Sequence, residues 1–425
     1  MTRVLLVLPS STYRASEFLA AAGRLGVDVV TGSDAPQVMA AALPDRFLVL
    51  PLGDPAAAAD AVASFHSVTP LDAIVAVDDA GALAAAAAAA RLGLAKNPPA
   101  AIAATRNKAV MRRLWRAAGI SQPRFEIVEA LPDEPAAIAG AGARLGYPVV
   151  VKPCSLSASR GVIRADDDEG ARVAATEVRR IALAAGRPRA EPLLVEGFVA
   201  GDEVALEGLL ADGRLDVLAV FDKPDPLAGP YFEETIYVSP SRHPGHLLEA
   251  LRGTVESACA ALGLVDGPVH AEARFSPRGS HPEAHVVVIE AAARTIGGRC
   301  SKALRFSSGR SLEEIVLAQA LGLEGDATSA RLPGASGVMM LPVPASGRLA
   351  GIDGVDAALA VPGVSGLEVT VPIGGTITAW PAGDRYLGFL FARAARPEDV
   401  EKALRRGFSS LTVRIDAALP VGAGG

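Results

Sequence analysis

Short apolar runs alternate with stretches of helical spacing over the first hundred residues. An apolar run at 3–9 is followed by a stretch of helical spacing at 16–25 and, after Gly26, by a second apolar run at 27–31. This order predicts a strand, a helix and a second strand. Two further apolar runs lie at 46–51 and 73–77, and the latter ends at Asp78-Asp79 before an alanine-rich helix. We therefore expect a Rossmann-like α/β domain over residues 1–98, with a parallel sheet covered by helices.

A second domain is predicted to begin after Asn97-Pro98-Pro99, because such a proline pair is typical of a linker. Residues 100–119 have the pattern of one helix, which ends at a turn between Gly119 and Pro123. Beyond it, strands are predicted at 125–128, at 147–152 and in several pieces from 193 to 220, and helices at 135–145, 169–185 and 311–321. The pattern favours an α+β domain with antiparallel sheets over residues 99–328.

The third segment is rich in glycine and proline and begins near Pro333. It contains predicted strands at 338–341, 367–371 and 387–394 and a predicted helix at 397–407. We expect a C-terminal α+β domain over residues 329–420, followed by a frayed tail at 421–425.

Composition narrows the function classes. Half of the 425 residues are apolar, and the formal net charge of −6 gives no reason to expect nucleic acid or an anionic membrane as partner. Three cysteines, an odd number without paired short spacing, indicate neither a disulfide framework nor a zinc site. The N-terminus lacks the pattern of a secretory signal, and the alanine-rich run at 80–90 is too weakly hydrophobic to span a bilayer. These features predict a cytoplasmic protein.

The first candidate for chemistry is a lysine before a loop of small residues. Lys152 ends the apolar run at 147–152, and the following loop, 155–161, carries Ser157 and Ser159. Small side chains let backbone N–H groups approach phosphate oxygens, serine hydroxyls add donors, and a lysine adds charge. The loop is not a P-loop, because the Gly-x-x-x-x-Gly-Lys-Ser/Thr pattern is absent. We expect Lys152 in a surface loop, and a plain polar turn remains an alternative.

Two acidic residues flank a turn further along the chain. Glu196 follows an apolar run, and Glu203 comes just after the turn at 200–202. Such carboxylates can accept hydrogen bonds from the amino group of adenine and from ribose hydroxyls. Two solvated glutamates are the alternative.

The strongest local pattern joins two predicted strands, 269–275 and 286–290. His270, Glu272 and Arg274 alternate and should point to one face, while Glu290 ends an apolar run four residues before Arg294. A carboxylate at the end of such a run is costly to bury without a cation. Two glutamates on neighbouring strands form the kind of oxygen-rich site that Mg²⁺ prefers, although an edge-exposed carboxylate is the alternative.

The order of these motifs resembles the ATP-grasp superfamily, and the 221–240 and 333–415 segments are similar to its L-amino-acid ligase group. The resemblance implies an ATP-grasp fold and an ATP-dependent, ADP-forming carboxylate-amine ligase that uses ATP and Mg²⁺, with Mn²⁺ as a possible substitute. Its partners would be small-molecule substrates, an amino acid and an amine, and the resemblance leaves open whether the protein forms a homodimer. It implies that Lys108, Lys152, Ser157, Ser159, Glu196, Phe198 and Glu203 bind ATP and that Glu272 and Glu290 bind metal. It also implies that Arg294, Lys152 and Arg274 are catalytic and that Lys223, Glu234, Tyr237, His270, Arg294, Gly297 and Gly298 contact substrate.

One position departs from the family pattern. The usual Glu-x-Asn-x-Arg occurs here as Glu290-Ala-Ala-Ala-Arg294, so the asparagine that assists a second metal ion is replaced by Ala292. The implied chemistry is transfer of the γ-phosphoryl group to a carboxylate and attack of an amine on the acyl phosphate. No cysteine or serine nucleophile is needed, and Cys300 is expected to be a structural thiol. The segments 155–161 and 226–240 are predicted lids that exclude water.

The sequence leaves three alternative functions to consider. Another ATP-grasp ligase, such as a carboxylase or a formyl-phosphate-using purine-type ligase, is disfavoured by the C-terminal segment. A nucleotide-binding protein without activity is supported only by Ala292. A dinucleotide-binding dehydrogenase would need Gly-x-Gly-x-x-Gly after the first strand, where this chain has Leu8-Pro-Ser-Ser-Thr12. His270 has two alternative roles: it is either the base that deprotonates the amine or a histidine that is only hydrogen-bonded.

Overall fold

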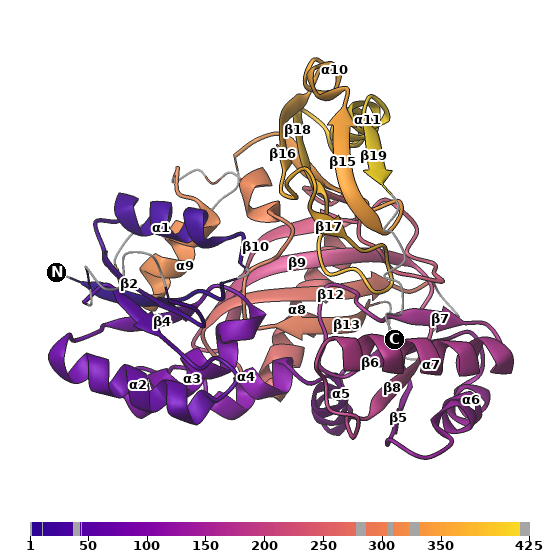
Figure 1. Ribbon diagram of the computed structural model, residues 1–425, viewed down its shortest axis with the longest axis horizontal. Coiled ribbons are helices and arrows are strands. Elements are labelled where there is room, and N and C mark those ends of the chain that lie inside the picture. The colour runs from indigo at the N-terminus through magenta and orange to yellow at the C-terminus, as the bar shows by residue number, and fades with distance from the viewer. Residues whose placement is uncertain are drawn as a thin grey trace, which may run out of the picture.

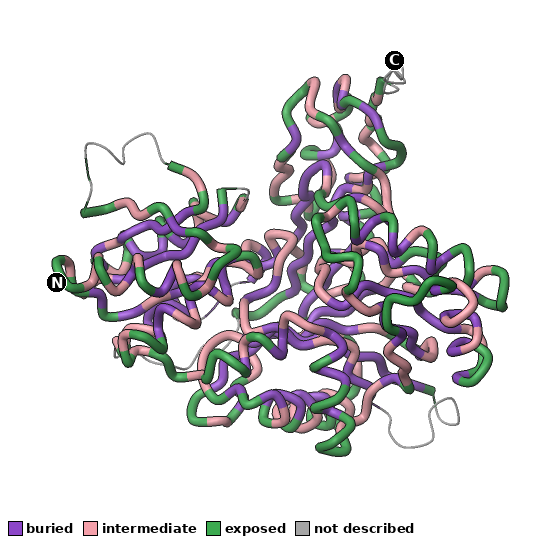
Figure 2. The backbone as a smooth tube through the Cα atoms, turned by 60° about the horizontal axis from the view of Figure 1, so that its bottom comes forward, coloured by how far each residue is buried: buried purple, intermediate pink, exposed green. Residues whose placement is uncertain are grey.

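The computed structural model describes residues 2–416 except Ser11, 37–42, Pro44, 278–285, Arg305, 307–308 and 324–331. The predicted tail at 421–425 lies outside these residues. Figure 1 shows three parts: an N-terminal α/β domain, a long central sheet with a smaller sheet beside it, and a C-terminal part that rises from the central sheet. Buried backbone follows the central strands and the helix faces packed against them (Figure 2).

The N-terminal domain is a parallel sheet with helices on both faces, as predicted. Its strand order is β3-β2-β1-β4. Alternate residues of β1 face opposite layers, so that Leu5 and Val7 pack toward α2 and α3, whereas Val4 and Leu6 pack toward α1 and α9 (Figure 1). The elements are β1 (Arg3–Val7), α1 (Ala15–Arg24), β2 (Asp28–Ser33), β3 (Phe47–Val49), α2 (Pro55–Val68), β4 (Ala73–Ala76), the 3₁₀ helix η1 (Asp79–Gly81) and α3 (Ala82–Arg91).

The helix predicted at 100–119 is two helices, α4 (Pro99–Thr105) and α5 (Lys108–Ala117). The break lies at Asn107, whose extended backbone, with φ −136°, begins α5 and whose side chain accepts a hydrogen bond from the Val110 N–H over 3.1 Å. The single-helix prediction was therefore wrong. The break makes Lys108 the first residue of α5.

A smaller antiparallel sheet follows, with the order β5-β8-β6-β7 and with α6 and α7 on one face. Val149 and Val151 of β6 pack into the core beneath α6 and α7. The alternating residues Val150 and Lys152 border the cavity described below. The elements are β5 (Phe125–Val128), α6 (Glu134–Leu145), β6 (Val149–Pro153), β7 (Ile163–Ala165), α7 (Asp168–Ala184) and β8 (Leu193–Gly197).

The central sheet has eight strands in the order β13-β12-β9-β10-β11-β14-β18-β16. The described strands of the predicted third domain therefore divide, because β14, β16 and β18 extend this sheet while β15, β17 and β19 form a separate three-stranded sheet. Helix α8, which the sequence analysis did not identify, packs against one face of the central sheet together with α5. The strands are β9 (Asp202–Ala211), β10 (Arg214–Asp222), β11 (Ile236–Ser239), β12 (Gly267–Phe275), β13 (Val286–Ala292), β14 (Ala335–Leu341), β15 (Gly347–Asp353), β16 (Val364–Val369), β17 (Thr376–Ile377), β18 (Gly388–Ala394) and β19 (Thr412–Asp416).

Strand β11 corrects the lid predicted at 226–240. Its four residues are buried between β10 and β14, so the end of that segment belongs to the sheet and only 226–235 remains as a connecting loop. The remaining helices are α8 (Gly245–Leu262), the 3₁₀ helix η2 (Cys300–Ala303), α9 (Leu312–Ala320), α10 (Val355–Leu359) and α11 (Pro397–Ser409).

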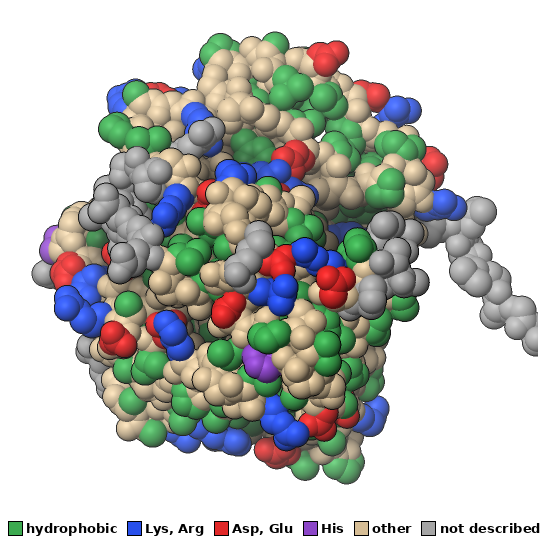
Figure 3. All heavy atoms as spheres, turned by 90° about the vertical axis from the view of Figure 1, so that its left-hand side faces the viewer, with side chains coloured by type: hydrophobic (Ala, Val, Ile, Leu, Met, Phe, Trp, Pro, Cys, Tyr) green, Lys and Arg blue, Asp and Glu red, His purple; other side chains and the backbone are tan. Residues whose placement is uncertain are grey.

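The surface on the N-terminal-domain side carries acidic and basic side chains interspersed with each other (Figure 3). This distribution agrees with the small net charge of −6. Among the helices of the described residues, none is both long enough and apolar enough to cross a membrane.

Candidate active site

One cavity of about 430 Å³ lies where the N-terminal domain, the smaller sheet, the central sheet and the C-terminal part meet. Of the site residues predicted from the sequence, only Lys223 does not line this cavity. Its ammonium group donates hydrogen bonds to Glu203, Glu234 and Glu272, which do line it. The predicted residues that line the cavity are Lys108, Lys152, Ser157, Ser159, Glu196, Phe198, Glu203, Glu234, Tyr237, His270, Glu272, Arg274, Glu290, Arg294, Gly297 and Gly298.

The Lys152 cluster consists of Lys152, Glu196 and Arg112. Because β6 and β8 are paired, Lys152 and Glu196 come from neighbouring strands, and the Lys152 Nζ atom lies 2.6 Å from Glu196 Oε2. Arg112 of α5 donates to the other carboxylate oxygen, Oε1, over 2.5 Å. Lys152 is only 4% exposed, so the expectation of a surface-loop lysine was wrong.

Two cations share one carboxylate in this cluster. Burial lowers the pKa of Lys152, and the Glu196 carboxylate, which acts in the opposite direction, does not cancel this effect. Burial raises the pKa of Glu196, but Arg112 and Lys152 outweigh it and leave this pKa below its ordinary value. The cluster therefore holds an ionised glutamate with positive charge in excess, which suits a bound polyanion.

Lys108 links the small-residue loop to the opposite wall. Its Nζ atom donates to the Leu156 carbonyl over 2.7 Å and lies 3.0 Å from Glu290 Oε1. The loop is also attached to the C-terminal part, because Arg160 Nε donates to the Ala382 carbonyl over 3.1 Å and the Gly161 N–H to the Pro381 carbonyl over 3.0 Å. The predicted lid at 155–161 is thus held between two parts of the molecule.

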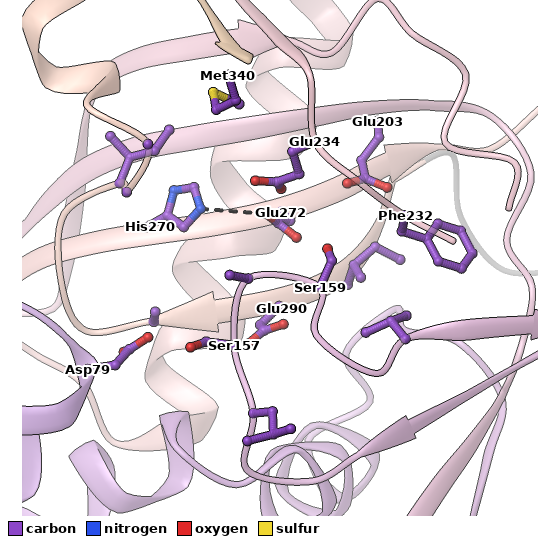
Figure 4. A pocket seen from close by; sticks show the side chains of 18 of the residues that line it. Asp79, Ser157, Ser159, Glu203, Phe232, Glu234, His270, Glu272, Glu290 and Met340 are labelled. Atoms are coloured by element: carbon purple, nitrogen blue, oxygen red, sulfur yellow. Dashed lines mark ion pairs between the residues drawn. The ribbon is translucent and has the colours of Figure 1, made fainter. Parts of the chain in front are cut away.

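The Lys223 cluster consists of Lys223 and three glutamates. Lys223 Nζ lies 2.8 Å from Glu203 Oε1, 2.8 Å from Glu234 Oε1 and 3.0 Å from Glu272 Oε1. Figure 4 shows the three carboxylates turned toward a common space, and one oxygen of each lies within 4.8 Å of the others. In this cluster one cation faces three anions.

The charge states of the Lys223 cluster follow from this imbalance. Burial alone would lower the pKa of Lys223, but the three carboxylates raise it well above its ordinary value. Burial raises the pKa of Glu272, but Lys223 and then His270 bring it well below the usual range. Burial also keeps the pKa of Glu234 raised, despite Lys223. Lys223 and Glu272 are therefore charged, and Glu234 takes a proton more readily than Glu272.

The two predicted metal ligands, Glu272 and Glu290, lie in register on the adjacent strands β12 and β13. In this structure each carboxylate accepts from a lysine, Glu272 from Lys223 and Glu290 from Lys108. Ionised carboxylates that are balanced by lysine ammonium groups are donors that a hard divalent cation can use. The residues present therefore fit a magnesium site, with Glu203 and Glu234 as additional nearby oxygens.

The far end of the cavity toward β7 is aromatic. The rings of Phe198 and Phe232 lie 6.4 Å apart, and the Arg274 guanidinium lies 5.0 Å from the centre of the Phe198 ring. Arg274 also donates to Glu203 Oε2, to the Val199 carbonyl and to the Leu227 carbonyl over 2.6–2.8 Å. Its Nε, Nη1 and Nη2 atoms are all engaged, so Arg274 holds the turn before β9 and the 226–235 loop in place.

Arg294 is paired with a residue of the N-terminal domain that the sequence analysis did not select. Asp79 Oδ1 lies 2.9 Å from Arg294 Nε and 2.8 Å from Arg106 Nη1. Burial raises the pKa of Asp79, but Arg294 and Arg106 outweigh it and lower this pKa to about 2. Arg14 supports the same segment by donating to the Val77 carbonyl over 2.9 Å and to the Thr295 hydroxyl. The position of Asp79 after β4, at the carboxyl end of a parallel strand, was the available signal.

His270 lies between two carboxylates on the cavity floor. Its Nε2 atom is 3.7 Å from Glu272 Oε1 and its Nδ1 atom is 3.5 Å from Glu207 Oε2 (the Glu272 pair is drawn in Figure 4). Burial lowers the pKa of His270, but Glu207 and Glu272 together raise it above its ordinary value. Glu207 also accepts from the Ile296 N–H over 2.9 Å, so it anchors the segment that follows Arg294.

The other acidic residue of the 226–240 segment lies apart from the cluster. Glu233 Oε1 accepts from the Val343 N–H over 3.4 Å, whereas Glu234 binds Lys223. Cys300 is a free, buried thiol whose pKa burial raises well above its ordinary value, as expected for a structural cysteine.

Comparison with known families finds matches in three regions of the chain. Residues 19–96 match the ATP-grasp N-terminal domain, residues 145–303 match the ATP-grasp domain, and residues 339–416 match the L-amino acid ligase C-terminal domain 2. The matches follow the order expected from the motifs.

Among curated proteins, alanine–anticapsin ligase of Bacillus subtilis (strain 168) is 27% identical over 243 residues, which cover 53% of this chain and 49% of that protein. The chain thus spans about half the length of the curated relatives that it matches first. An uncharacterized protein of Sinorhizobium fredii is 26% identical over 307 residues, or 72% of this chain and 60% of that protein.

Among solved structures, L-amino acid ligase from Bacillus licheniformis superposes with a TM-score of 0.79 at 26% identity, covering 98% of this chain and 99% of that one. Carboxyaminoimidazole ribonucleotide synthase from Aspergillus clavatus, complexed with ATP, has a TM-score of 0.73 at 17% identity over 96% of this chain and 98% of that one. The second likeness concerns the fold alone.

Proposed function

Because this chain belongs to the L-amino-acid ligase group of the ATP-grasp superfamily, we propose that it joins a carboxylate to an amine at the expense of ATP. An amino acid is the proposed acyl donor, and an acyl phosphate is the proposed intermediate. The products would be an amide or peptide, ADP and phosphate.

The observation that carries the proposal is that one side of the cavity has an excess of positive charge and the other side has an excess of negative charge. The Lys152 cluster and Lys108 present cations on one side, and the Lys223 cluster with Glu290 presents carboxylates on the other. A nucleotide polyphosphate with a divalent cation complements both sides, because phosphate oxygens need cations and a metal ion needs oxygen ligands.

The nucleotide would lie between the smaller sheet and the central sheet. The Phe198 ring would offer an apolar surface to the base, and Glu203, which contacts the same Arg274 side chain as this ring, would accept from ribose hydroxyls. Lys108, Lys152 and the loop hydroxyls of Ser157 and Ser159 would neutralise and orient the phosphates. Both oxygens of Glu196 already accept from Lys152 and Arg112, so its proposed contribution to ATP binding is to hold Lys152 in place.

Glu272 and Glu290 would hold magnesium, or manganese in its place. The bound ion would supply charge neutralisation of the β- and γ-phosphates. Ala292, which borders the cavity and offers no side-chain oxygen, leaves a second ion to be held by carboxylates of the Lys223 cluster instead.

The acyl group would lie at Arg294. A carboxylate oxygen attacks the γ-phosphorus as ADP leaves, and the amine then attacks the acyl carbon as phosphate leaves with the bonding electrons. The guanidinium of Arg294, held by Asp79, would stabilise the acyl phosphate and the tetrahedral oxyanion. Arg274, with its donors engaged elsewhere, is proposed to position Glu203 and the 226–235 loop, and the hydrogen-bonded loop at 155–161 would exclude water.

Product analysis tests the proposal. Purified protein is incubated with ATP, Mg²⁺ and pairs of amino acids, and ADP, AMP, phosphate and amide are quantified. We expect ADP and phosphate in equal amounts, formed only when both an amino acid and an amine are present. AMP with pyrophosphate, or nucleotide turnover that ignores the amino acid, would overturn the proposed ligase.

A further inference from the structure

The cavity has a second aromatic end, and we propose that it binds a large apolar side chain, preferably aromatic, of the acyl donor. The inference rests on the proposed ligase function and adds the class of acid that the site prefers. Its residues come from three parts of the chain: Tyr13 precedes α1, Met340 lies in β14, and Tyr386 and Phe389 lie before and within β18.

These side chains form one continuous wall. The ring centres of Tyr13 and Phe389 lie 5.9 Å apart, and those of Tyr386 and Phe389 lie 6.1 Å apart in an edge-to-face arrangement. Trp380 stacks on Tyr386 from behind at 5.1 Å. Spacings of this size are typical of aromatic clusters that can accept a further ring.

Tyr13 is fixed with one surface open to the cavity. Its hydroxyl accepts a hydrogen bond from the Gly298 N–H over 2.8 Å, and the Arg299 guanidinium lies 5.5 Å from its ring centre. The residue is nevertheless 41% exposed, and it lines the cavity, so part of its surface is available to a ligand.

Glycine at 298 makes this arrangement possible. Its backbone has φ +59°, which side-chain-bearing residues rarely adopt, and a Cβ atom there would lie 3.2 Å from the Met340 sulfur. The segment therefore passes close to Met340 and leaves the thioether beside the aromatic wall. Methionine sulfur makes favourable contacts with aromatic rings and adapts to ligands of different shape.

The position of the wall assigns it to the acyl donor. Ile296, Gly297 and Gly298 begin two residues after Arg294 and border the same cavity as Tyr13 and Met340. The side chain of an amino acid begins two bonds from its carboxyl carbon. With the carboxylate bound at Arg294, the side chain would therefore lie near the 296–298 segment. In Figure 4, Met340 lies above His270 and Glu234, whereas Phe232 lies at the right of the view, past Glu203.

The other aromatic pair does not compete for this role. Phe198 and Phe232 lie beside Arg274 and Glu203, at the end proposed for adenine and ribose. The wall formed by Tyr13, Met340, Tyr386 and Phe389 therefore remains available for the substrate. Larger apolar side chains remove more apolar surface from water there and therefore gain most binding free energy.

A donor-only assay tests the preference. With hydroxylamine as the amine, the acyl phosphate of each acid gives a hydroxamate and phosphate, so the acceptor subsite is not needed. We expect kcat/KM for L-phenylalanine to exceed that for L-alanine by about tenfold or more. In Tyr386→Ala and Tyr13→Ala this ratio should fall at least about fivefold, whereas Tyr386→Phe, which retains the ring, should keep it. A ratio near one in the unmodified protein, or one that both alanine variants leave unchanged, would overturn the inference.

Calorimetric titration of L-phenylalanine and L-alanine in the presence of ADP and Mg²⁺ separates this inference from the ligase proposal. Tighter binding of phenylalanine that Tyr386→Ala removes, in a protein that forms no hydroxamate with any acid, would support the side-chain site and contradict the ligase. Hydroxamate formation without selective binding or selective turnover would support the ligase and contradict the side-chain site.

Discussion

The Lys152 and Lys223 clusters are built from the same residue types but with opposite proportions. In the first, Lys152 and Arg112 share the single carboxylate of Glu196; in the second, Lys223 faces Glu203, Glu234 and Glu272, of which Glu203 also pairs with Arg274. Both are buried, and both have short nitrogen–oxygen distances. The comparison shows that the charge left over after pairing, rather than the presence of ion pairs, indicates which ligand group a buried cluster can accept.

The largest effect is expected when the cationic cluster loses its lysine. Lys152→Ala should lower kcat/KM for ATP by about 10²–10³-fold, because a charge placed at the phosphates is lost. It should also destabilise the protein by about 1–3 kcal/mol, because a carboxylate oxygen of Glu196 is left buried without a partner. Turnover is measured by ADP release and stability by denaturant unfolding.

The exposed lysine Lys402 of α11 provides the control, and Lys402→Ala should change neither quantity appreciably. Turnover of Lys152→Ala within a few-fold of the parent would show that the excess positive charge of this cluster does not serve phosphate.

The next effect concerns the carboxylate that Lys108 holds. Glu290→Gln keeps the shape of the side chain and removes its charge, so turnover should fall about 100-fold and added Mg²⁺ should restore it only in part. The melting temperature without nucleotide should stay close to that of the parent. The control is Glu249→Gln on the exposed side of α8. Near-normal turnover at limiting Mg²⁺ would remove Glu290 from the metal site.

The two clusters can also be compared through protein stability, by replacing the lysine of each cluster with methionine. Lys223→Met leaves three buried carboxylates without their ammonium partner and should lower stability by about 3 kcal/mol or more. Millimolar Mg²⁺ should recover part of this loss, because a divalent cation replaces the missing charge. Lys152→Met, which leaves no carboxylate excess, should not respond to Mg²⁺. Equal responses of the two variants would break the comparison.

The smallest effect concerns the pairing of Asp79 with Arg294 and Arg106. Because the folded pKa of Asp79 is lowered from 3.8 to about 2, its contribution is present above about pH 4 and is lost as pH falls through about 2. The shift corresponds to roughly 2 kcal/mol. Asp79→Asn should therefore lose about that much stability relative to the parent at pH 6, and the difference should shrink toward pH 3. The exposed Asp216→Asn should show no such trend, and a constant difference would contradict this assignment.

The sequence predicted the cavity wall better than the contacts within it. His270, Glu272 and Arg274 were expected on one face because strand residues alternate, and all three line the cavity. The partner of Glu196 was missed, because Arg112 lies 84 residues away on a helix and nothing local in the sequence relates the two. Charge pairing between residues far apart in the chain is a property of tertiary structure, so its detection needs coordinates.

The same distinction holds for the fold. The parallel sheet of the N-terminal domain follows from local order, whereas the break before Lys108 depended on one N-cap, Asn107, within a continuous helical pattern. The membership of β14 and β18 in the central sheet could not be predicted, because a strand's own pattern does not specify its neighbour.

Shared membership of that sheet sets a limit on recombination among relatives. A hybrid made by exchanging everything after residue 330 would replace β14, the partner of β11, with the corresponding strand of a relative; the native register runs from Ile236–Met339 to Ser239–Ser336. A replacement strand that does not match β11 would leave an unpaired strand edge, which invites aggregation. Natural or engineered exchange of the C-terminal part therefore succeeds only where the crossover preserves this strand pairing, so new substrate preferences in this architecture should arise more readily by point substitution than by swapping domains.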